Sequence, residues 1–295
     1  PGAASATRTE RDLPMKNRLA PAAIVAASAL ALAACSGSTS EEETTAAGTT
    51  AAAGEVTTLT IGATPVPHAE ILAFVDENLA AEAGIDLEIV EYTDYVQPNV
   101  ALSEGDLDAN YFQHLPYFDA EVAEKGYEFT ASPGIHIEPY GVYSESVASL
   151  DELPDGAQVA VPNDPSNQAR ALVLLENEGL FTLADVENPT IFDVADNPKN
   201  IELSELDAAQ LPRSLQDVDA AVINGNFALE AGLVPTEDAI ALESGEDNPY
   251  ANIVAYRTED ASSEALAALV ELLTSDEVRT YIEETWPNGE LIPAF

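Results

Sequence analysis

The sequence has very little positive charge. Only 10 residues are Lys or Arg, against 53 Asp and Glu, so the formal net charge is −43 at pH 7. Such a chain repels nucleic acid phosphates and anionic lipid headgroups, which argues against a nucleic-acid-binding role. The hydrophobic fraction of 46% is high enough to bury a substantial core, so the chain is not disordered throughout.

Cysteine is almost absent. The single Cys35 leaves no partner for an internal disulfide or a cysteine-based metal cluster. Residues 15–34 form a pattern typical of a signal peptide, with positive residues followed by an apolar run too short to span a bilayer comfortably. The run ends in Leu-Ala-Ala-Cys, which resembles a bacterial lipobox. We therefore expect Cys35 to be lipidated and to anchor the protein outside the cytoplasm, on the cell membrane.

The segments on either side of the signal peptide carry no apolar periodicity. Residues 1–14 precede Met15 and are interpreted as a start-site extension. Residues 35–55 are rich in Ser, Thr, Gly and Ala, a composition that predicts a flexible tether. The folded part is expected to begin at Val56.

Strand and helix patterns alternate from Val56 onward, which predicts α/β architecture with parallel sheets. A first set contains expected strands at 56–63, 85–90 and 107–109 and helices at 68–83, 99–102 and 114–125. A second set contains strands at 157–161, 201–203, 218–224 and 239–242 and helices at 165–175 and 208–215, and helices at 263–273 and 275–284 end the chain.

Two extended segments, residues 133–144 and 248–256, are suited to crossing between these two sets. Two lobes joined by two crossings place a cleft between them, where ligands of open α/β sheets bind. We expect residues 56–140 and 250–295 to form lobe 1 and residues 141–249 to form lobe 2.

Arg170 stands out because cations are so scarce. It lies just over one turn into the helix that Asp164 is expected to cap, with Pro165 at its first position. Helical side chains lean toward the N-terminus, where unpaired N–H groups and the helix dipole favour an anion. This placement predicts a site for a ligand carboxylate. The alternative is a surface arginine paired with a nearby Asp or Glu.

A set of motifs spread from Thr58 to Phe295 closely resembles the methionine-binding lipoproteins of bacterial ABC importers, the NlpA-type family. The motifs are Gly62-Ala63-Thr64-Pro65 with Pro67-His68-Ala69-Glu70, Asp94-Tyr95-Val96-Gln97-Pro98-Asn99, the segment from Gly105 to His114, the segment from Pro162 to Arg170, Gln210-Leu211-Pro212-Arg213-Ser214-Leu215, Ala221-Val222-Ile223-Asn224, Pro249-Tyr250-Ala251-Asn252 and Leu291-Ile292-Pro293-Ala294-Phe295.

The resemblance implies a two-lobed fold like that of type II periplasmic binding proteins. It also implies roles for six residues. Arg170 would hold the carboxylate of an amino acid through both prongs of its guanidinium, and Asn224 and Asn252 would hydrogen-bond its polar end. Tyr95, Phe112 and His114 would line the side-chain pocket, where aromatic edges suit a thioether.

Each of these residues also has a simpler interpretation. Tyr95 and Phe112 are suitable core aromatics, His114 is a suitable helix cap, and the two asparagines are suitable turn residues.

The resemblance implies that the chain is a monomeric substrate-binding subunit and not an enzyme. It would capture methionine and deliver it to a permease driven by a cytoplasmic ATPase, with no cofactor. The alternative is an importer subunit for zinc or manganese, because His68, His114 and His136 with abundant carboxylates offer metal ligands. An enzyme would need a nucleophile beside a base, and Ser166 near an unspecified histidine is too thin a basis.

Overall fold

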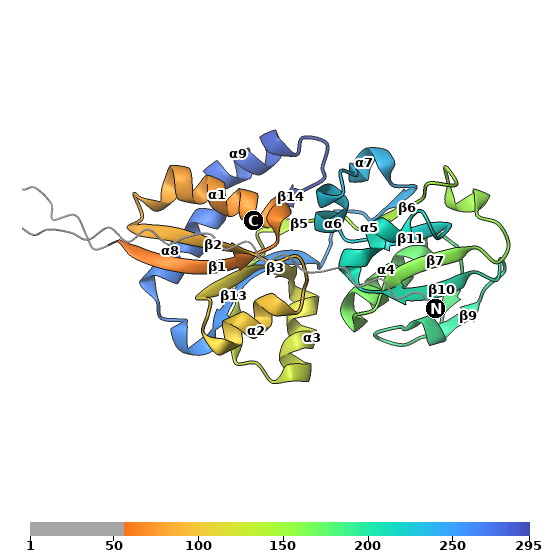
Figure 1. Cartoon of the computed structure of the whole chain (residues 1–295), viewed down its shortest axis with the longest axis horizontal. Coiled ribbons are helices and arrows are strands. Elements are labelled where there is room, and N and C mark those ends of the chain that lie inside the picture. The colour runs from red at the N-terminus through yellow and green to blue at the C-terminus, as the bar shows by residue number, and fades with distance from the viewer. Residues whose placement is uncertain (1–55) are drawn as a thin grey trace, which may run out of the picture. The chain divides into compact units, whose positions relative to one another are not determined.

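Residues 56–295 are the part of the chain that the computed structural model describes. They belong to one compact unit that contains two main sheets, each with its own helices (Figure 1). The start-site extension, the signal peptide, Cys35 and the tether all lie outside the described residues. We call the part built on the larger sheet the first lobe and the part built on the smaller sheet the second lobe.

The first lobe contains a seven-stranded sheet in the order β14-β5-β13-β3-β1-β2, with β4 also paired to β13. Its centre is parallel, because β1 (Thr57–Ala63) pairs with β2 (Ile85–Glu91) on one side and β3 (Ala109–His114) on the other. The C-terminal strand β13 (Ala251–Arg257) adds antiparallel to β3. The short strands are β4 (Phe129–Ala131), β5 (His136–Ile137) and β14 (Ile292–Pro293).

Helices cover both faces of this sheet because its strands are apolar on both sides. Along β13, Val254 points into one buried cluster, whereas Ile253 and Ala255 point into another. The first cluster includes residues of α1 (Glu70–Val75), α8 (Glu264–Leu273) and α9 (Asp276–Thr285). The second includes residues of α2 (Gln97–Glu104) and α3 (Leu115–Lys125).

The second lobe contains a five-stranded sheet in the order β10-β7-β11-β6-β12. Its strands are β6 (Gly141–Tyr143), β7 (Gln158–Pro162), β10 (Glu202–Leu206), β11 (Ala220–Ile223) and β12 (Ala241–Leu242). Strand β7 is parallel to both of its neighbours, β10 and β11. Strand β6 is antiparallel to both of its neighbours, β11 and the edge strand β12. The helices of the second lobe are α4 (Pro165–Asn177), α5 (Leu211–Ser214), α6 (Gly225–Glu230) and α7 (Pro235–Asp238). Strands β8 (Thr182–Leu183) and β9 (Val194–Asp196) pair with each other in a separate two-stranded sheet.

The chain crosses between the two sheets twice. Residues 138–140 lead from β5 in the first lobe to β6 in the second, and residues 243–250 lead back from β12 to β13. The fold class is therefore the two-lobed α/β class with two crossings that the sequence predicted. The residue boundaries proposed for the lobes remain a prediction. No helix among residues 56–295 is both long and apolar enough to cross a membrane.

Some elements differ from the sequence-based expectation. The sequence predicted a strand at 107–109, but β3 extends over Ala109–His114. Its residues Asn110 and Gln113 are polar yet buried, so the strand lacks an apolar pattern. The helix predicted from His114 is confirmed, since α3 begins at Leu115 with His114 as its N-cap. The helix expected at 208–215 is divided into a 3-10 turn at Ala208–Gln210 and α5, whose first turn contains Pro212.

Candidate functional site

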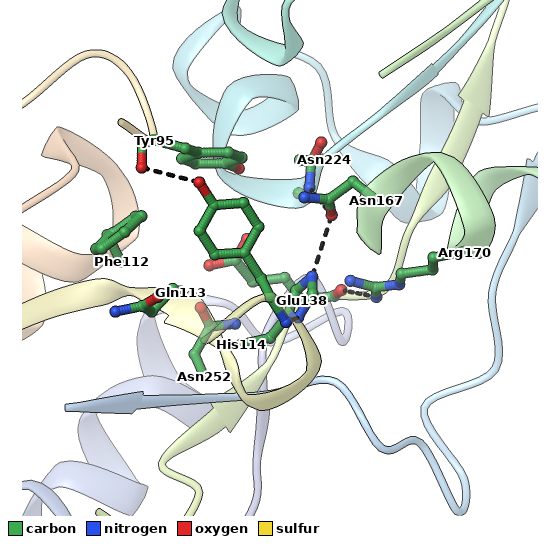
Figure 2. A pocket seen from close by; sticks show the side chains of 11 residues that line it. Tyr95, Phe112, Gln113, His114, Glu138, Asn167, Arg170, Asn224 and Asn252 are labelled. Carbon is green, nitrogen blue, oxygen red and sulfur yellow. Dashed lines mark hydrogen bonds between the residues drawn. The ribbon is translucent and has the colours of Figure 1, made fainter. Parts of the chain in front are cut away.

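A cavity lies between the lobes, lined by side chains of both (Figure 2). The first lobe supplies residues of β3 and of the segments around it, namely Phe112, Gln113, His114, Tyr95, Tyr117 and Asn252. The second lobe supplies Asn167, Arg170, Asn224 and Gly225, and the first crossing supplies Glu138. The structure thus brings together all six predicted ligand-binding residues, Tyr95, Phe112, His114, Arg170, Asn224 and Asn252. Their contact with a ligand remains a prediction.

Helix α4 begins as the sequence predicted and carries Arg170 to the cavity. The Asp164 side chain accepts a hydrogen bond from the Asn167 N–H at 2.8 Å, and Pro165 occupies the first turn. Arg170 is only 4% exposed. Its Cζ lies 4.7 Å from the centroid of the Tyr140 ring and 4.1 Å from that of Tyr250, so two aromatic rings hold the guanidinium.

The guanidinium is already paired within the protein. Nε of Arg170 donates to Glu243 Oε1 at 3.0 Å and Nη2 donates to Glu243 Oε2 at 2.5 Å. Nη2 also donates to the backbone oxygen of Glu138 at 2.9 Å. The two-pronged edge expected to hold a ligand carboxylate is therefore occupied by Glu243. Among the hydrogen bonds of the described residues none uses Nη1, which is the group left for a ligand.

His114 is both a helix cap and part of the cavity wall. Its Nδ1 accepts the Tyr117 N–H at 3.1 Å, so Nε2 carries the ring proton and donates to Asn167 Oδ1 at 3.1 Å. Burial lowers the pKa of His114 to about 3, and the nearby Arg170 charge acts in the same direction. The ring is neutral at pH 7 and offers packing surface to the cavity.

The two predicted asparagines take part in hydrogen bonds on opposite sides of the cavity. Asn224 donates from Nδ2 to Asn167 Oδ1 at 2.8 Å and accepts the Tyr140 hydroxyl at 3.3 Å. Asn252 accepts from His68 Nε2 at 3.1 Å. These bonds fix both amide groups, so a ligand would meet a preformed set of polar atoms.

Aromatic rings form the apolar part of the cavity. The Tyr95 ring centroid lies 5.8 Å from that of Phe112, 5.8 Å from that of Tyr117 and 4.9 Å from that of Phe227. The Tyr95 hydroxyl donates to Asn226 Oδ1 at 2.5 Å, which joins the first lobe to α6 of the second. Tyr95 is thus both a wall residue and a link between lobes.

Glu138 is the main lining residue that the sequence did not single out. It is 6% exposed, its Oε1 accepts from His136 Nε2 at 2.9 Å, and its Oε2 accepts the Asn226 N–H at 2.8 Å. Burial alone would raise the pKa of Glu138. The pKa is nevertheless held below its usual value by the hydrogen bond from His136, by the nearby rings of His68 and His136, and by the hydrogen bond from the Asn226 N–H. The one signal in the sequence was a lone carboxylate in a turn-rich crossing segment.

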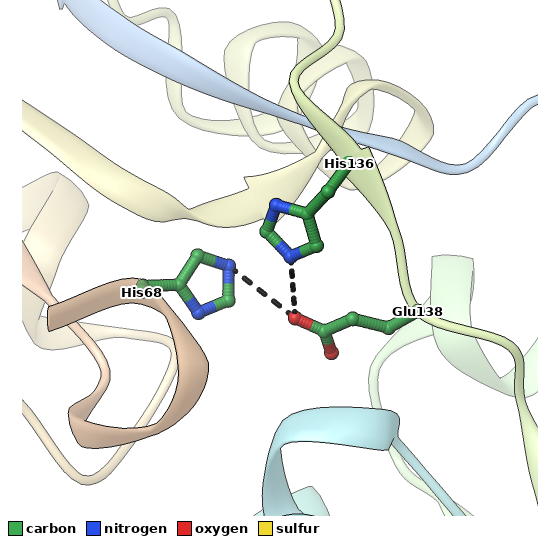
Figure 3. A group of neighbouring side chains, drawn as sticks. All are labelled: His68, His136 and Glu138. Atoms are coloured by element: carbon green, nitrogen blue, oxygen red, sulfur yellow. Dashed lines mark hydrogen bonds and ion pairs between the residues drawn. The ribbon is translucent and has the colours of Figure 1, made fainter. Parts of the chain in front are cut away.

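His68, His136 and Glu138 offer ring nitrogens and a carboxylate oxygen within 4.8 Å of one another (Figure 3). His114 is not in this group, so the three histidines do not form the set considered as a metal site. The Nδ1 atoms of His68 and His136 pair with the hydroxyls of Thr64 at 2.7 Å and Tyr111 at 2.5 Å. Burial lowers the pKa of His68 to about 4.

Comparison with known proteins agrees with this architecture. The NlpA lipoprotein family model matches residues 59–295. The chain is 47% identical over 210 residues to the D-methionine-binding lipoprotein MetQ of Escherichia coli (strain K12), with 70% of this chain and 77% of the relative covered. It is 38% identical over 241 residues to the methionine-binding lipoprotein MetQ of Bacillus subtilis (strain 168), with 80% of this chain and 87% of the relative covered.

Solved structures show the same similarity. A nutrient binding protein from Burkholderia cenocepacia bound to methionine is 46% identical with a TM-score of 0.78, and the match covers 80% of this chain and 100% of that one. A putative lipoprotein from Actinomyces odontolyticus is 51% identical with a TM-score of 0.79, covering 81% and 100% of the two chains.

Proposed function

Because this chain belongs to the NlpA lipoprotein family, we propose that it is the substrate-binding lipoprotein of an ABC importer and captures methionine in the cavity between its lobes. The observation that carries the proposal is that one cavity combines an aromatic wall with charged and amide groups. Methionine and its close relatives have that same division into an apolar thioether and a charged end. The protein releases its ligand unchanged to a membrane permease and is not an enzyme.

The lining residues match the parts of the ligand. The rings of Tyr95, Phe112 and Tyr117 suit a polarizable thioether, which packs well against aromatic edges. Nη1 of Arg170 and the amide groups of Asn224 and Asn252 suit the polar end. Closure of the lobes around the ligand is a hinge motion at the two crossings.

The remaining parts of the proposal rest on the sequence and on the relatives. Lipidation of Cys35 in its lipobox anchors the protein outside the cytoplasm. A solved relative, from Coxiella burnetii, is described as a periplasmic substrate-binding protein of an ABC transporter, which supports a permease and an ATPase as partners. The protein acts as a monomer in this proposal, because both lobes of one chain supply the residues that line the cavity.

Calorimetric titration of the full chain tests the proposal. We expect saturable heat with L-methionine at one ligand per chain, and much weaker binding of glycine, which has the same charged groups but no thioether. No heat with methionine, or equal affinity for glycine, would contradict a methionine-specific cavity. D-methionine, titrated in parallel, decides whether the site distinguishes the two configurations.

A second candidate, zinc or manganese binding, is favoured by the group of His68, His136 and Glu138. The hydrogen bonds argue against it. Asn252 Oδ1 and the Glu138 carboxylate can only accept, so both Nε2 atoms that a metal would need carry protons. Chelator-reversible zinc binding together with no response to methionine would favour this second candidate.

A further inference from the structure

We infer that Glu138 selects ligands that carry a free ammonium group, and that the cavity recognises this ammonium more strongly than it recognises a carboxylate. The inference rests on the proposed function and adds a residue and a ranking to it. The ranking is unexpected, because the sequence singles out Arg170 and therefore the carboxylate. It follows from the charges that each group meets in the structure.

The positive charge of Arg170 is largely used inside the protein. Glu243 takes both its Nε and its Nη2, and the Glu243 side chain is only 17% exposed, so water screens this pair weakly. Glu243 is itself held by Asn248 Nδ2 at 2.8 Å. A ligand carboxylate therefore meets a guanidinium whose charge is already balanced, through Nη1 alone.

The negative charge of Glu138 has no comparable partner. Within residues 56–295 its ion pairs involve only His136 and His68, at 2.9 and 3.5 Å. The lowered pKa of His68 means that this ring is neutral at pH 7. His136 Nε2 donates to the Glu138 carboxylate, and the Tyr111 hydroxyl lies within hydrogen-bond distance of its Nδ1. Hydrogen bonds thus stabilise the carboxylate, while no Lys or Arg of the described chain neutralises it.

Glu138 is also fixed in place facing the cavity (Figure 2). A Cβ atom at Gly225 would lie 2.7 Å from the Glu138 Cβ and 3.1 Å from its Oε2, so only glycine fits at that position. Oε2 accepts one bond, from the Asn226 N–H, which leaves a lone pair for a ligand. An ammonium group there would form a charge-assisted hydrogen bond with a buried carboxylate.

The test compares three ligands that share the thioether. L-methionine carries both charged groups, 3-(methylthio)propylamine lacks the carboxylate, and 4-(methylthio)butanoate lacks the ammonium. For the full wild-type chain we expect the butanoate to bind more weakly than the amine, and more weakly than methionine by roughly 10- to 100-fold, the range for a lost hydrogen bond to a charged group. Butanoate binding equal to or tighter than amine binding would overturn the inference.

The variant Glu138→Gln keeps the size of the side chain and removes its charge. We expect methionine affinity to fall by roughly tenfold or more while butanoate affinity stays the same or rises, so the preference for the amine disappears. The matched control is Glu290→Gln, because Glu290 is also 6% exposed but does not line the cavity. The control should keep the wild-type preference.

The ratio of amine to butanoate affinity within one variant does not depend on the folded fraction, so partial misfolding does not imitate the expected result. An unchanged ratio in Glu138→Gln, with methionine still bound, overturns the role of Glu138 and leaves the proposed function standing. If the wild-type chain binds no methionine, both proposals fail.

Discussion

The two lobes contribute different chemistry to one cavity. The first lobe supplies mainly rings, from Tyr95, Phe112, His114 and Tyr117, whereas the second supplies polar groups, from Asn167, Arg170 and Asn224. Neither surface alone matches a ligand that is apolar at one end and charged at the other. The difference between the lobes explains why a binding protein of this kind needs closure: only the closed arrangement presents both surfaces at once.

The comparison predicts the largest effect in the second lobe, for Arg170→Ala. The change removes a predicted ligand contact and leaves Glu243 without its cation. Breaking a buried ion pair costs about 3–5 kcal/mol. We expect methionine affinity and the free energy of unfolding both to fall, measured by calorimetry and by thermal denaturation. Unchanged affinity would mean that Arg170 serves only to bind Glu243.

The double variant Arg170→Met with Glu243→Gln separates those two roles. Because it removes both charges, it should recover most of the lost stability, but methionine affinity should remain low. Recovery of affinity as well would assign Arg170 a purely structural role.

Acid should weaken the first lobe more than the second. All three histidines of the chain, His68, His114 and His136, lie in the first lobe. Burial holds the pKa of His68 at about 4 and that of His114 at about 3, below the unfolded value of 6.5. Below pH 6.5 the unfolded chain binds these protons and the folded chain does not, so each residue lowers stability by up to about 1.4 kcal/mol per pH unit between pH 6.5 and its folded pKa.

Hydrogen exchange at pH 7 and pH 5, corrected for the intrinsic pH dependence, checks this prediction. We expect the amides of β1, β3 and β13 to lose more protection than those of β7 and β11. His68→Gln should flatten the pH dependence of unfolding. Equal loss in both lobes would show that the buried histidines do not control acid stability.

A substitution in the aromatic wall should have a smaller effect. Phe112 is 3% exposed and lies 5.8 Å from the Tyr95 ring, centroid to centroid. Phe112→Leu keeps an apolar side chain but removes the aromatic contact, so we expect methionine affinity to fall by about 1 kcal/mol. Glycine binding, measured in the same way, should not change, since glycine has no side chain to contact this wall.

A last prediction, of similarly small size, concerns the link between the lobes. Tyr95→Phe removes a hydrogen bond to Asn226 across the lobes and should shift the unliganded protein toward an open form, at a cost of about 0.5–1.5 kcal/mol. Tyr117→Phe is the matched control, because its hydroxyl donates to the backbone oxygen of Tyr95 within the first lobe. Small-angle scattering should show opening for the first variant only.

Local patterns were sufficient where one segment carries all the information. The cap at Asp164, the proline at the first turn and the apolar face of α4 are all contained in one stretch, and they predicted both the helix and the approach of Arg170 to a cavity. The pattern failed at β3, where polar side chains fill a buried strand. Asn110 donates to Asn99 Oδ1 at 2.9 Å and Gln113 to the same oxygen at 2.9 Å, and such partners come from another element.

The sequence by itself determined the α/β class and the two crossings, because apolar periodicity, caps and turn residues act over a few positions. The six residues that gather around one cavity were named from the motifs that resemble a known family, and only Arg170 was also indicated by its local helix. Only the tertiary structure decided how the charges are shared. Arg170 meets Glu243, 73 residues further along the chain, and the backbone N–H that donates to the Glu138 carboxylate belongs to Asn226, 88 residues away. No local pattern encodes such pairs, because the electrostatic environment of a buried group is set by whichever chain segments the fold packs around it.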